Sequence, residues 1–389
     1  MRWHVKIACI SNYDALDPHA FGGRVYYHLQ AIRRINPAMH FIGPLSYLKY
    51  APMLYMKRAV YSKIQKKRYA QWRDRRLVMD LSRQISRRIS KLDAEIILSP
   101  ESPASQPFAY LEAKQPIVMW TDTSFAGYLD LVQPDRWCKE TLRDGIENER
   151  AALGRAGRVI FYSEWAAELA RRYYDLTPEK VRVVPSGPAF DDSQAITFEE
   201  AKQIVRARPR DRCRLLFVGG DWERKGGATV LEVARRLNAA GLATEAVVVG
   251  CEPPPDEPLP EFLRVSGYIS RANKDGEAKL NQLFRTSHFM LLPSRSDCSP
   301  LVLVEANAWA LPSIATDVGG IPEIVRSGVN GVTFATSADP DQYCAYIEAL
   351  FTNYDRYEQL ALSAFSEFQT RLNNRTAAAS VLNVMSELL

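Results

Sequence analysis

Residues 293–312 read PSRSDCSPLVLVEANAWALP, and this stretch combines the end of an expected strand with an apolar helix. The twelve residues that follow Ser299 are apolar on nearly every side, which is typical of a helix buried in a protein core. Glu305 lies within this helix, and Asp297 precedes Glu305 by eight residues. A buried carboxylate that lacks a partner costs several kcal/mol. Glu305 is therefore expected to meet a hydrogen-bonding group, supplied either by the backbone of a neighbouring loop or by a ligand.

The start of this helix is suited to bind an anion. Ser299 is expected to cap the helix and Pro300 to be its first residue, where the missing proline N–H costs nothing. The N–H groups of Leu301 and Val302 would then point outward, toward an anion. Glu305 lies one turn beyond Leu301 on the same helix face. A phosphate bound at the helix start would thus bring the hydroxyl groups of its ligand to Glu305.

A second turn carries two cations. Residues 217–227 read FVGGDWERKGG, so Arg224 and Lys225 lie just before a helix that begins at Gly226 or Gly227. Two cations in front of helix N–H groups suit a diphosphate. The alternative is a surface loop whose charges are accidental.

Paired glycines mark two more turns between an expected strand and a helix. Gly22 and Gly23 follow the first strand and form either an anion-binding turn or a simple turn. Gly319 and Gly320 follow a later strand and precede a short helix that has Pro322 at its start. Ligands of open α/β sheets bind at the carboxyl ends of the strands, so these turns are candidates for the walls of a binding site.

Short β-branched runs alternate with helical patterns along the whole chain and predict the fold class. Strands that carry few charges and are separated by crossovers indicate parallel sheets buried on both faces. Two such series predict two doubly wound, Rossmann-like α/β domains, which we place at residues 1–190 and 191–370. The strands are expected at 4–10, 39–43, 94–100, 116–120, 158–163, 180–187, 214–220, 244–250, 263–268, 288–294, 312–318 and 331–334.

The composition of the 389 residues is that of a globular protein, with 47% hydrophobic and 24% charged residues. No apolar run approaches the roughly 18 residues that a membrane span requires. Lys6 interrupts the apolar core that a signal peptide would need, so a cytoplasmic location is expected. The six cysteines are scattered without a C-x-x-C pair, which argues against a zinc site and against a disulfide framework.

Positive charge is concentrated in residues 49–91, which hold fourteen lysines and arginines and only two acids, Asp74 and Asp80. The apolar residues of this segment fall at helical spacings, so one or two basic amphipathic helices are expected. Such helices meet a phosphate-rich acceptor or an anionic membrane surface, or they simply present a solvated basic face. Nucleic acid is not an expected partner, because no helix-turn-helix or zinc-finger pattern is present.

Taken together, these motifs resemble those of the retaining nucleotide-sugar glycosyltransferases of family 4, which have the two-domain GT-B fold. That family carries an acid, seven residues and a glutamate, followed by small residues, Gly-x-Pro, a strand and Gly-Gly-x-x-Glu. Here the pattern runs from Asp297 to Glu305 and continues as ANAWALPSIATDVGGIPEIVRSGVNG. In the first half of the chain the likeness is weaker and includes GGRVYYHL, from Gly22 onward, and KVRVVPSG.

The resemblance implies roles for individual residues in donor binding. Glu305 would hold the ribose hydroxyls, Lys225 the donor diphosphate, and Asp297 the transferred sugar. Gly22 and Gly23 would lie near the donor phosphate and the acceptor. No metal and no cofactor are implied beyond the nucleotide sugar, which would be of the UDP or GDP type.

The resemblance also implies an architecture and a reaction. The two domains would face each other across a cleft, and a C-terminal helix at 371–389 would pack back on the first domain. A hexose would pass, with retention of configuration, to a glycan or lipid-linked acceptor by front-face attack. The basic segment 49–91 would favour a peripheral membrane contact, at the inner face of the membrane.

The chain departs from the family pattern at several positions. Asp297 stands where glutamate is usual, and Pro300 replaces a residue with a backbone donor. The family arginine after the strand near residue 217 is absent, so Arg224 is a candidate substitute. Asp122 stands where many relatives have histidine and is a candidate to orient the sugar or the acceptor. A nucleotide-sugar epimerase of the same fold and a non-catalytic nucleotide-sugar-binding subunit remain alternatives.

Overall fold

The computed structural model describes residues 4–100, 106–132, 134–254, 258–271 and 273–389. The chain divides into two compact units. The N-terminal unit comprises Met1–Pro185 and Asn374–Leu389, and the C-terminal unit comprises Ser186–Asn373. Among the described residues, each unit contains one six-stranded sheet in which all paired strands are parallel.

The sheet of the N-terminal unit has the strand order β2-β1-β3-β4-β5-β6. Each of its strands overlaps one of the regions predicted from the sequence, and β4 extends one residue beyond its region. They are short, mostly buried runs of branched residues, as is typical of parallel strands covered on both faces. The strands are β1 (Ile7–Ile10), β2 (Met39–Ile42), β3 (Ile96–Ser99), β4 (Ile117–Thr121), β5 (Arg158–Phe161) and β6 (Val181–Val183).

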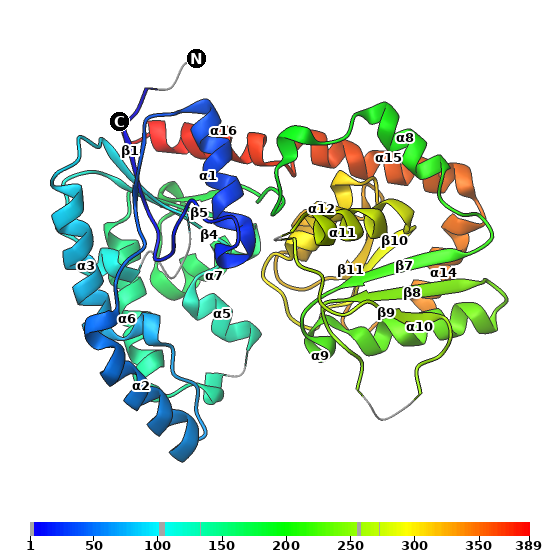
Figure 1. Cartoon of the computed structure of the whole chain (residues 1–389), viewed down its shortest axis with the longest axis horizontal. Helices are drawn as coiled ribbons and strands as arrows, with labels where there is room; N and C mark the ends of the chain where they lie inside the picture. The colour runs from blue at the N-terminus through cyan, green and yellow to red at the C-terminus, as the bar shows by residue number, and fades with distance from the viewer. Residues whose placement is uncertain (1–3, 101–105, 133, 255–257, 272) are drawn as a thin grey trace. The chain divides into compact units, whose positions relative to one another are not determined.

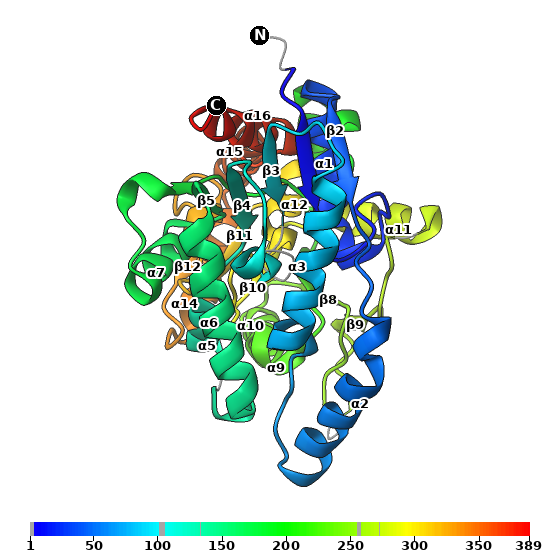
Figure 2. The same ribbon diagram turned by 90° about the vertical axis from the view of Figure 1, so that its left-hand side faces the viewer.

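Two separate layers of helices cover this sheet. One face packs against α3, α6 and α7, and the other against α1 and α16. Figure 2 shows α3 and α6 side by side on their face. The helices of the unit are α1 (Arg24–Ile35), α2 (Ala51–Ala59), α3 (Arg75–Ile89), α5 (Phe125–Leu131), α6 (Lys139–Arg155), α7 (Glu164–Tyr174) and α16 (Asn374–Ser386).

The C-terminal helix α16 lies alongside α1 in the N-terminal unit (Figure 1). Its apolar face, which includes Ala378, Val381 and Leu382, is fully or almost fully buried against that unit's sheet. Near its end, the carboxylate of Glu387 accepts hydrogen bonds from Arg158 (2.9 Å) and Arg182 (2.7 Å) at β5 and β6. The last helix thus belongs to the first unit, although the chain reaches it through the second.

The sheet of the C-terminal unit has the order β12-β11-β10-β7-β8-β9. The chain builds outward from β7 on one side and then returns to add β10 on the other, so the strand order reverses between β7 and β10. Here too each strand overlaps a predicted region, and β7 begins one residue before its region. The strands are β7 (Cys213–Val218), β8 (Thr244–Val249), β9 (Leu263–Val265), β10 (Phe289–Leu292), β11 (Ser313–Thr316) and β12 (Gly331–Phe334).

The helix that carries Glu305 is α12 (Leu301–Ala308), and it is buried as its all-round apolar sequence predicts. It packs against α15, and α10 packs against α14. The other helices of the unit are α8 (Phe198–Arg206), α9 (Trp222–Lys225), α10 (Gly227–Ala239), α11 (Lys274–Thr286), α13 (Ile321–Ile324), α14 (Pro340–Phe351) and α15 (Tyr354–Thr370).

The basic segment divides into two parts with different surroundings. The apolar face of α3, including Leu77, Leu81 and Ile85, is fully buried, so this helix presents only a solvated basic face. In α2 only Leu54 is buried. In both views α2 lies at the end of the N-terminal unit remote from α16 (Figures 1 and 2).

No helix within the described ranges combines the length and apolarity that a bilayer crossing requires.

Candidate functional site

The reversal of strand order in the C-terminal unit brings two of the predicted turns into contact. Lys225 ends α9 after β7, and Asp297 lies in the turn after β10. Their side chains form an ion pair, and each is only 11% exposed. The hydroxyl of Ser294 also bonds the Asp297 carboxylate, at 3.3 Å. The lysine and the aspartate predicted from the sequence therefore form one partly buried polar cluster at the carboxyl edge of the sheet.

Two glycines allow the backbones of these turns to approach each other closely. Gly226 has φ +81°, and a Cβ there would collide with the carbonyl oxygen of Pro293. Gly319 has φ +57°, and a Cβ there would collide with the carbonyl oxygen of Asp297. Because only glycine fits these positions, they fix the turn after β10 between the turns after β7 and β11.

Arg224 holds the same turn from the side of β7. Its Nη1 donates to the carbonyl oxygen of Ser296 at 2.9 Å and lies 4.0 Å from the Asp297 carboxylate. The carbonyl oxygen of Arg224 accepts from the N–H of Arg295 at 2.8 Å. Arg224 is 40% exposed, so part of its guanidinium remains open to a ligand while the rest braces the loop.

The start of α12 differs in one detail from the prediction. The helix begins at Leu301 with Pro300 as the N-cap residue, and no side chain caps it, so the predicted Ser299 cap is wrong. Pro300 has an extended conformation (φ −73°, ψ 108°), and its ψ places it outside the helix, so the cap position lies one residue beyond Ser299. The Ser299 hydroxyl is buried and makes no hydrogen bond with the described residues. A buried hydroxyl beside open helix N–H groups is suited to bind an anion.

Glu305 is buried, and its carboxylate has an ion-pair partner. Its Oε2 accepts a hydrogen bond of 2.9 Å from Nη2 of Arg271, which lies between β9 and α11. The partner in the structure is therefore an arginine side chain, whereas the sequence led us to expect a loop backbone or a ligand. The sequence analysis missed Arg271 because an arginine in a polar loop gives no signal of a buried partner.

In the N-terminal unit, the predicted glycines and Asp122 lie at the carboxyl edge of the sheet. Gly22 and Gly23 end a 3-10 helix at Ala20–Gly23, and Gly23 (φ +80°) is the N-cap of α1. The first residue of α1, Arg24, places Nη1 3.2 Å from Oδ2 of Asp122, which follows β4. Asp122 also accepts from the N–H of Thr123 at 2.9 Å. Asp122 is therefore an ion-paired carboxylate, a contact that the sequence analysis did not foresee.

The candidate site is built from cations, helix N–H groups and paired carboxylates. Within the described part of the chain, no three histidine, cysteine, aspartate or glutamate side chains gather as metal ligands would. The Asp339-Pro-Asp341 string, which has the spacing of some metal-binding motifs, instead caps α14, because the Asp339 carboxylate accepts from the N–H of Asp341 (2.9 Å).

Residues 212–353 match the model of a protein family described as glycosyl transferases group 1. The matched region contains the turns after β7, β10 and β11 and the whole of α12. The C-terminal unit is thus similar to this glycosyltransferase group, and we call it the group 1 unit. The resemblance noted from Asp297, Glu305 and the glycine turns is thereby confirmed for this unit.

Curated relatives of the chain include D-inositol 3-phosphate glycosyltransferases. The protein from Catenulispora acidiphila is 29% identical over 230 residues, which are 56% of this chain and 54% of the relative. The protein from Thermobifida fusca is 28% identical over 219 residues, which are 53% of this chain and 50% of the relative. The chain spans about half the length of these curated relatives.

Solved structures match the chain over nearly its whole length and show its fold. Anabaena HepE in complex with UDP and glucose has a TM-score of 0.65 at 14% identity, with 99% of this chain and all of that one covered. Sucrose-phosphate synthase from Thermosynechococcus elongatus has a TM-score of 0.71 at 16% identity, with 99% of each chain covered. The group 1 unit and the N-terminal unit thus have the folds of GT-B glycosyltransferases, as predicted.

Proposed function

We propose that this chain is a retaining glycosyltransferase that moves a hexose from a nucleoside-diphosphate sugar to a glycan or lipid-linked acceptor. The observation that carries the proposal is the polar cluster at the strand-order reversal of the group 1 unit. There Lys225 comes from the turn after β7, whereas Asp297 and the start of α12 come from the turn after β10, and the two turns adjoin at one sheet edge. Relatives of the chain are named glycosyltransferases, and HepE, a structural neighbour, was solved with UDP-glucose.

In the proposed complex the donor diphosphate lies between Lys225 and the start of α12. Lys225 exchanges its contact with Asp297 for a phosphate oxygen, and the N–H groups of Leu301 and Val302 donate to the same diphosphate. These donors stabilise the charge that develops on the leaving nucleoside diphosphate, without the need for a metal. The Ser299 hydroxyl supplies a further donor in the same region.

The carboxylates have separate proposed roles. Once Lys225 turns to the phosphate, Asp297 is released to accept hydrogen bonds from the sugar hydroxyls. Glu305 accepts from the ribose hydroxyls of the nucleotide. Asp122, which is paired with Arg24, orients the sugar or the acceptor from the N-terminal unit. In this proposal the turn at Gly22 and Gly23 lies near the donor phosphate and the acceptor.

Substitution of the two principal donor-binding residues tests this proposal. We expect Lys225→Ala and Glu305→Ala each to lower kcat/KM at least about 100-fold, because each removes a charged contact to the donor. The exposed residues Lys279 and Glu261 provide matched controls, Lys279→Ala and Glu261→Ala, which should retain full activity. Circular dichroism should show that all four variants are folded. Wild-type turnover by Lys225→Ala or Glu305→Ala would contradict the proposal.

The product formed distinguishes the transferase from its two alternatives. A retaining transferase releases nucleoside diphosphate and forms a new glycoside with the anomeric configuration of the donor, which NMR identifies. An epimerase would instead incorporate solvent deuterium at C2 of the sugar. A non-catalytic binding subunit would release no nucleoside diphosphate from any donor.

The basic segment 49–91 favours an acceptor at a membrane. Within this region, the part around α2 is the one whose exposed residues suit a membrane contact. We call residues 48–68 the basic arm; it comprises α2, the π-helix Val60–Ile64 and their flanks, and it contains no acidic residue. Met56, Val60 and Ile64 follow at four-residue spacing and are all exposed. Exposed basic residues surround them: Lys49, Arg58, Lys63, Lys66 and Arg68. Exposed apolar residues among cations suit an anionic bilayer surface.

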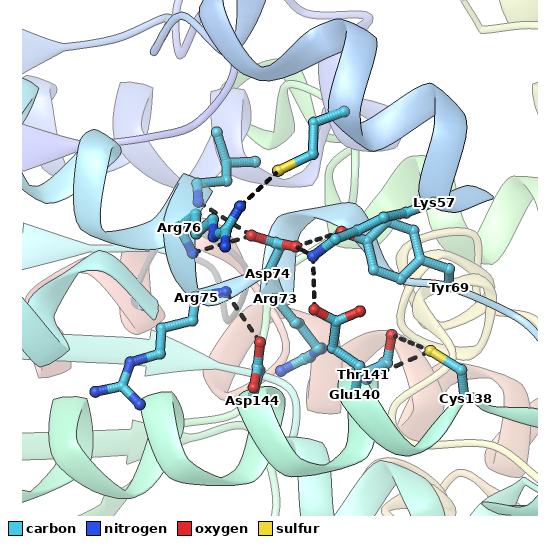
Figure 3. A network of polar contacts seen from close by, with 12 residues as sticks. Lys57, Tyr69, Arg73, Asp74, Arg75, Arg76, Cys138, Glu140, Thr141 and Asp144 are labelled. Atoms are coloured by element: carbon cyan, nitrogen blue, oxygen red, sulfur yellow. Dashed lines mark hydrogen bonds and ion pairs between the residues drawn. The ribbon is translucent and has the colours of Figure 1, made fainter. Parts of the chain in front are cut away.

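Lys57 joins the basic arm to the body of the N-terminal unit (Figure 3). Its ammonium lies 2.6 Å from the carboxylates of both Asp74 and Glu140. Tyr69 donates to Asp74 at 2.6 Å, and Tyr61 donates to Glu140 at 2.8 Å. Burial, together with this bond to Glu140, raises the pKa of Tyr61 to about 12. The buried side of the arm is thus fixed, which leaves its apolar and basic side to face outward.

Vesicle sedimentation tests the membrane contact. The wild-type protein should pellet with vesicles that contain phosphatidylglycerol and be released by about 1 M salt, because each basic side chain contributes about 1 kcal/mol at an anionic surface. The triple variant Met56→Ser, Val60→Ser and Ile64→Ser should remain in the supernatant and keep its activity on a water-soluble acceptor. A wild-type protein that does not pellet would contradict this contact. The cytoplasmic location inferred from the sequence stays a prediction.

A further inference from the structure

We propose that Arg271 is a positioning residue for nucleotide binding, which holds Glu305 by one carboxylate oxygen and leaves the other for the ribose. This inference rests on the proposed function. Arg271 donates to Oε2 of Glu305 at 2.9 Å, and Oε1 makes no hydrogen bond with the described residues. The side chains are 18% and 8% exposed, respectively, so the pair is largely shielded from water.

The position of Arg271 is fixed by groups other than Glu305. Its guanidinium carbon lies 5.3 Å from the ring centre of Phe190 and 5.8 Å from that of Phe284. Its Nη1 donates to Oδ1 of Asn281 on α11 at 3.2 Å. Two aromatic rings and an amide therefore hold the guanidinium in place, so that it can act as a fixed point for a carboxylate on another helix.

This arrangement has a consequence for a ligand that carries neighbouring hydroxyls. A hydroxyl donates a stronger hydrogen bond to a carboxylate than to a neutral acceptor, and Oε1 of Glu305 is the carboxylate oxygen that Arg271 does not contact. The bond from Arg271 also fixes the side-chain rotamer of Glu305, so the cost of ordering Glu305 is not incurred when the ligand binds.

The opposite hypothesis is that the ion pair occupies Glu305 and must break before the ribose can bind. Under that hypothesis removal of Arg271 frees the carboxylate and strengthens nucleotide binding. If the guanidinium merely supports the fold, its removal weakens the binding of every nucleotide equally. These alternatives give different results with ligands that possess or lack the ribose hydroxyls.

The experiment measures dissociation constants by calorimetry for UDP or GDP, whichever the wild-type protein binds, and for the 2′,3′-dideoxy form of the same nucleotide. We expect Arg271→Met to weaken binding of the normal nucleotide about tenfold and to leave binding of the dideoxy form nearly unchanged. Arg271→Lys should restore part of the loss. The matched control Arg264→Met removes an exposed arginine from β9 and should bind as the wild type does.

A double variant tests whether Arg271 acts through Glu305. Arg271→Met combined with Glu305→Gln should bind no more weakly than Glu305→Gln alone, because both changes remove one and the same ribose contact. Tighter binding by Arg271→Met, an equal loss for both nucleotide forms, or additive losses in the double variant would overturn the inference. Should Arg271→Met fail to fold by circular dichroism, Arg271→Lys is subjected to the same comparison. If the wild-type protein binds neither UDP nor GDP, the proposed function fails first and this inference fails with it.

Discussion

Ala310 occupies a backbone conformation that normally requires glycine. It has φ +50° at the end of α12, where its N–H bonds to Asn307 and the N–H of Leu311 bonds to Ala306. This is the Schellman motif, whose left-handed residue is most often glycine, and the family pattern has glycine at this place. We predict that Ala310→Gly raises the free energy of unfolding by about 0.5–1 kcal/mol, because relief of left-handed strain exceeds the entropy that glycine adds to the unfolded chain. Urea titration measures this change, and a less stable variant would show that the left-handed residue is not strained.

His288 is a buried histidine that must remain neutral in the folded protein. Its Nδ1 accepts from the N–H of Arg214 at 2.9 Å, and its Nε2 faces the carbonyl oxygen of Pro209 at 2.8 Å. Burial, together with the nearby positive charge of Arg208, lowers the pKa of His288 to about 3. Between about pH 6.5 and pH 3 the unfolded chain therefore binds a proton that the folded chain does not.

Because the folded-state pKa is the lower one, the stability that His288 contributes is present above pH 6.5 and is lost as the pH falls. We predict a loss of up to about 1.4 kcal/mol per pH unit from this one residue. His288→Gln should lack this component, so the unfolding free energies of wild type and variant should converge from pH 6.5 to pH 4.5. Parallel pH profiles would contradict the prediction.

At the scale of elements, the buried Arg208 secures the C-terminal end of α12. It donates to the carbonyl oxygens of Trp309 and Ala310, each at 2.8 Å, and to the hydroxyl of Tyr357 at 2.6 Å. Arg208→Met would leave buried carbonyl groups unsatisfied and remove a cation from a helix C-terminus, so we predict a loss of about 3 kcal/mol. The nearby exposed Arg206, paired with Glu358, is the control, and Arg206→Met should cost less than about 1 kcal/mol. If thermal unfolding showed equal losses of stability for Arg208→Met and Arg206→Met, Arg208 would not stabilise the end of α12 as predicted.

The elements themselves were largely predictable from the sequence, whereas several contacts of the site were not. Branched, uncharged runs identify buried parallel strands, and glycines mark turns where backbones approach closely, as at Gly226 and Gly319. The pairing of Glu305 with Arg271, and of Asp122 with Arg24, depends on how distant segments pack, which local pattern does not encode. The cap of α12 lies one residue after the predicted Ser299, and a sequence pattern does not specify the end of a helix more precisely than this.

At the scale of the whole molecule, a nucleotide sugar that contacts residues of both units should draw them together. Asp122 and Gly23 lie in the N-terminal unit, while Lys225 and Glu305 lie in the C-terminal unit. We predict that the radius of gyration measured by small-angle X-ray scattering falls when the donor nucleotide is added. Lys225→Ala at the same nucleotide concentration should show a smaller fall or none. An unchanged radius in the wild type at saturation would argue against closure.

The central claim is that the C-terminal unit binds a nucleoside diphosphate through Lys225 and the start of α12. The most direct test is a thermal-shift measurement with UDP, GDP and ADP, because a ligand that binds only the folded state raises the unfolding midpoint. The account predicts that UDP or GDP raises the midpoint of the wild-type protein and that Lys225→Ala abolishes the shift while Lys279→Ala preserves it. A wild-type midpoint that none of the three nucleotides moves, or a full shift in Lys225→Ala, would contradict the claim.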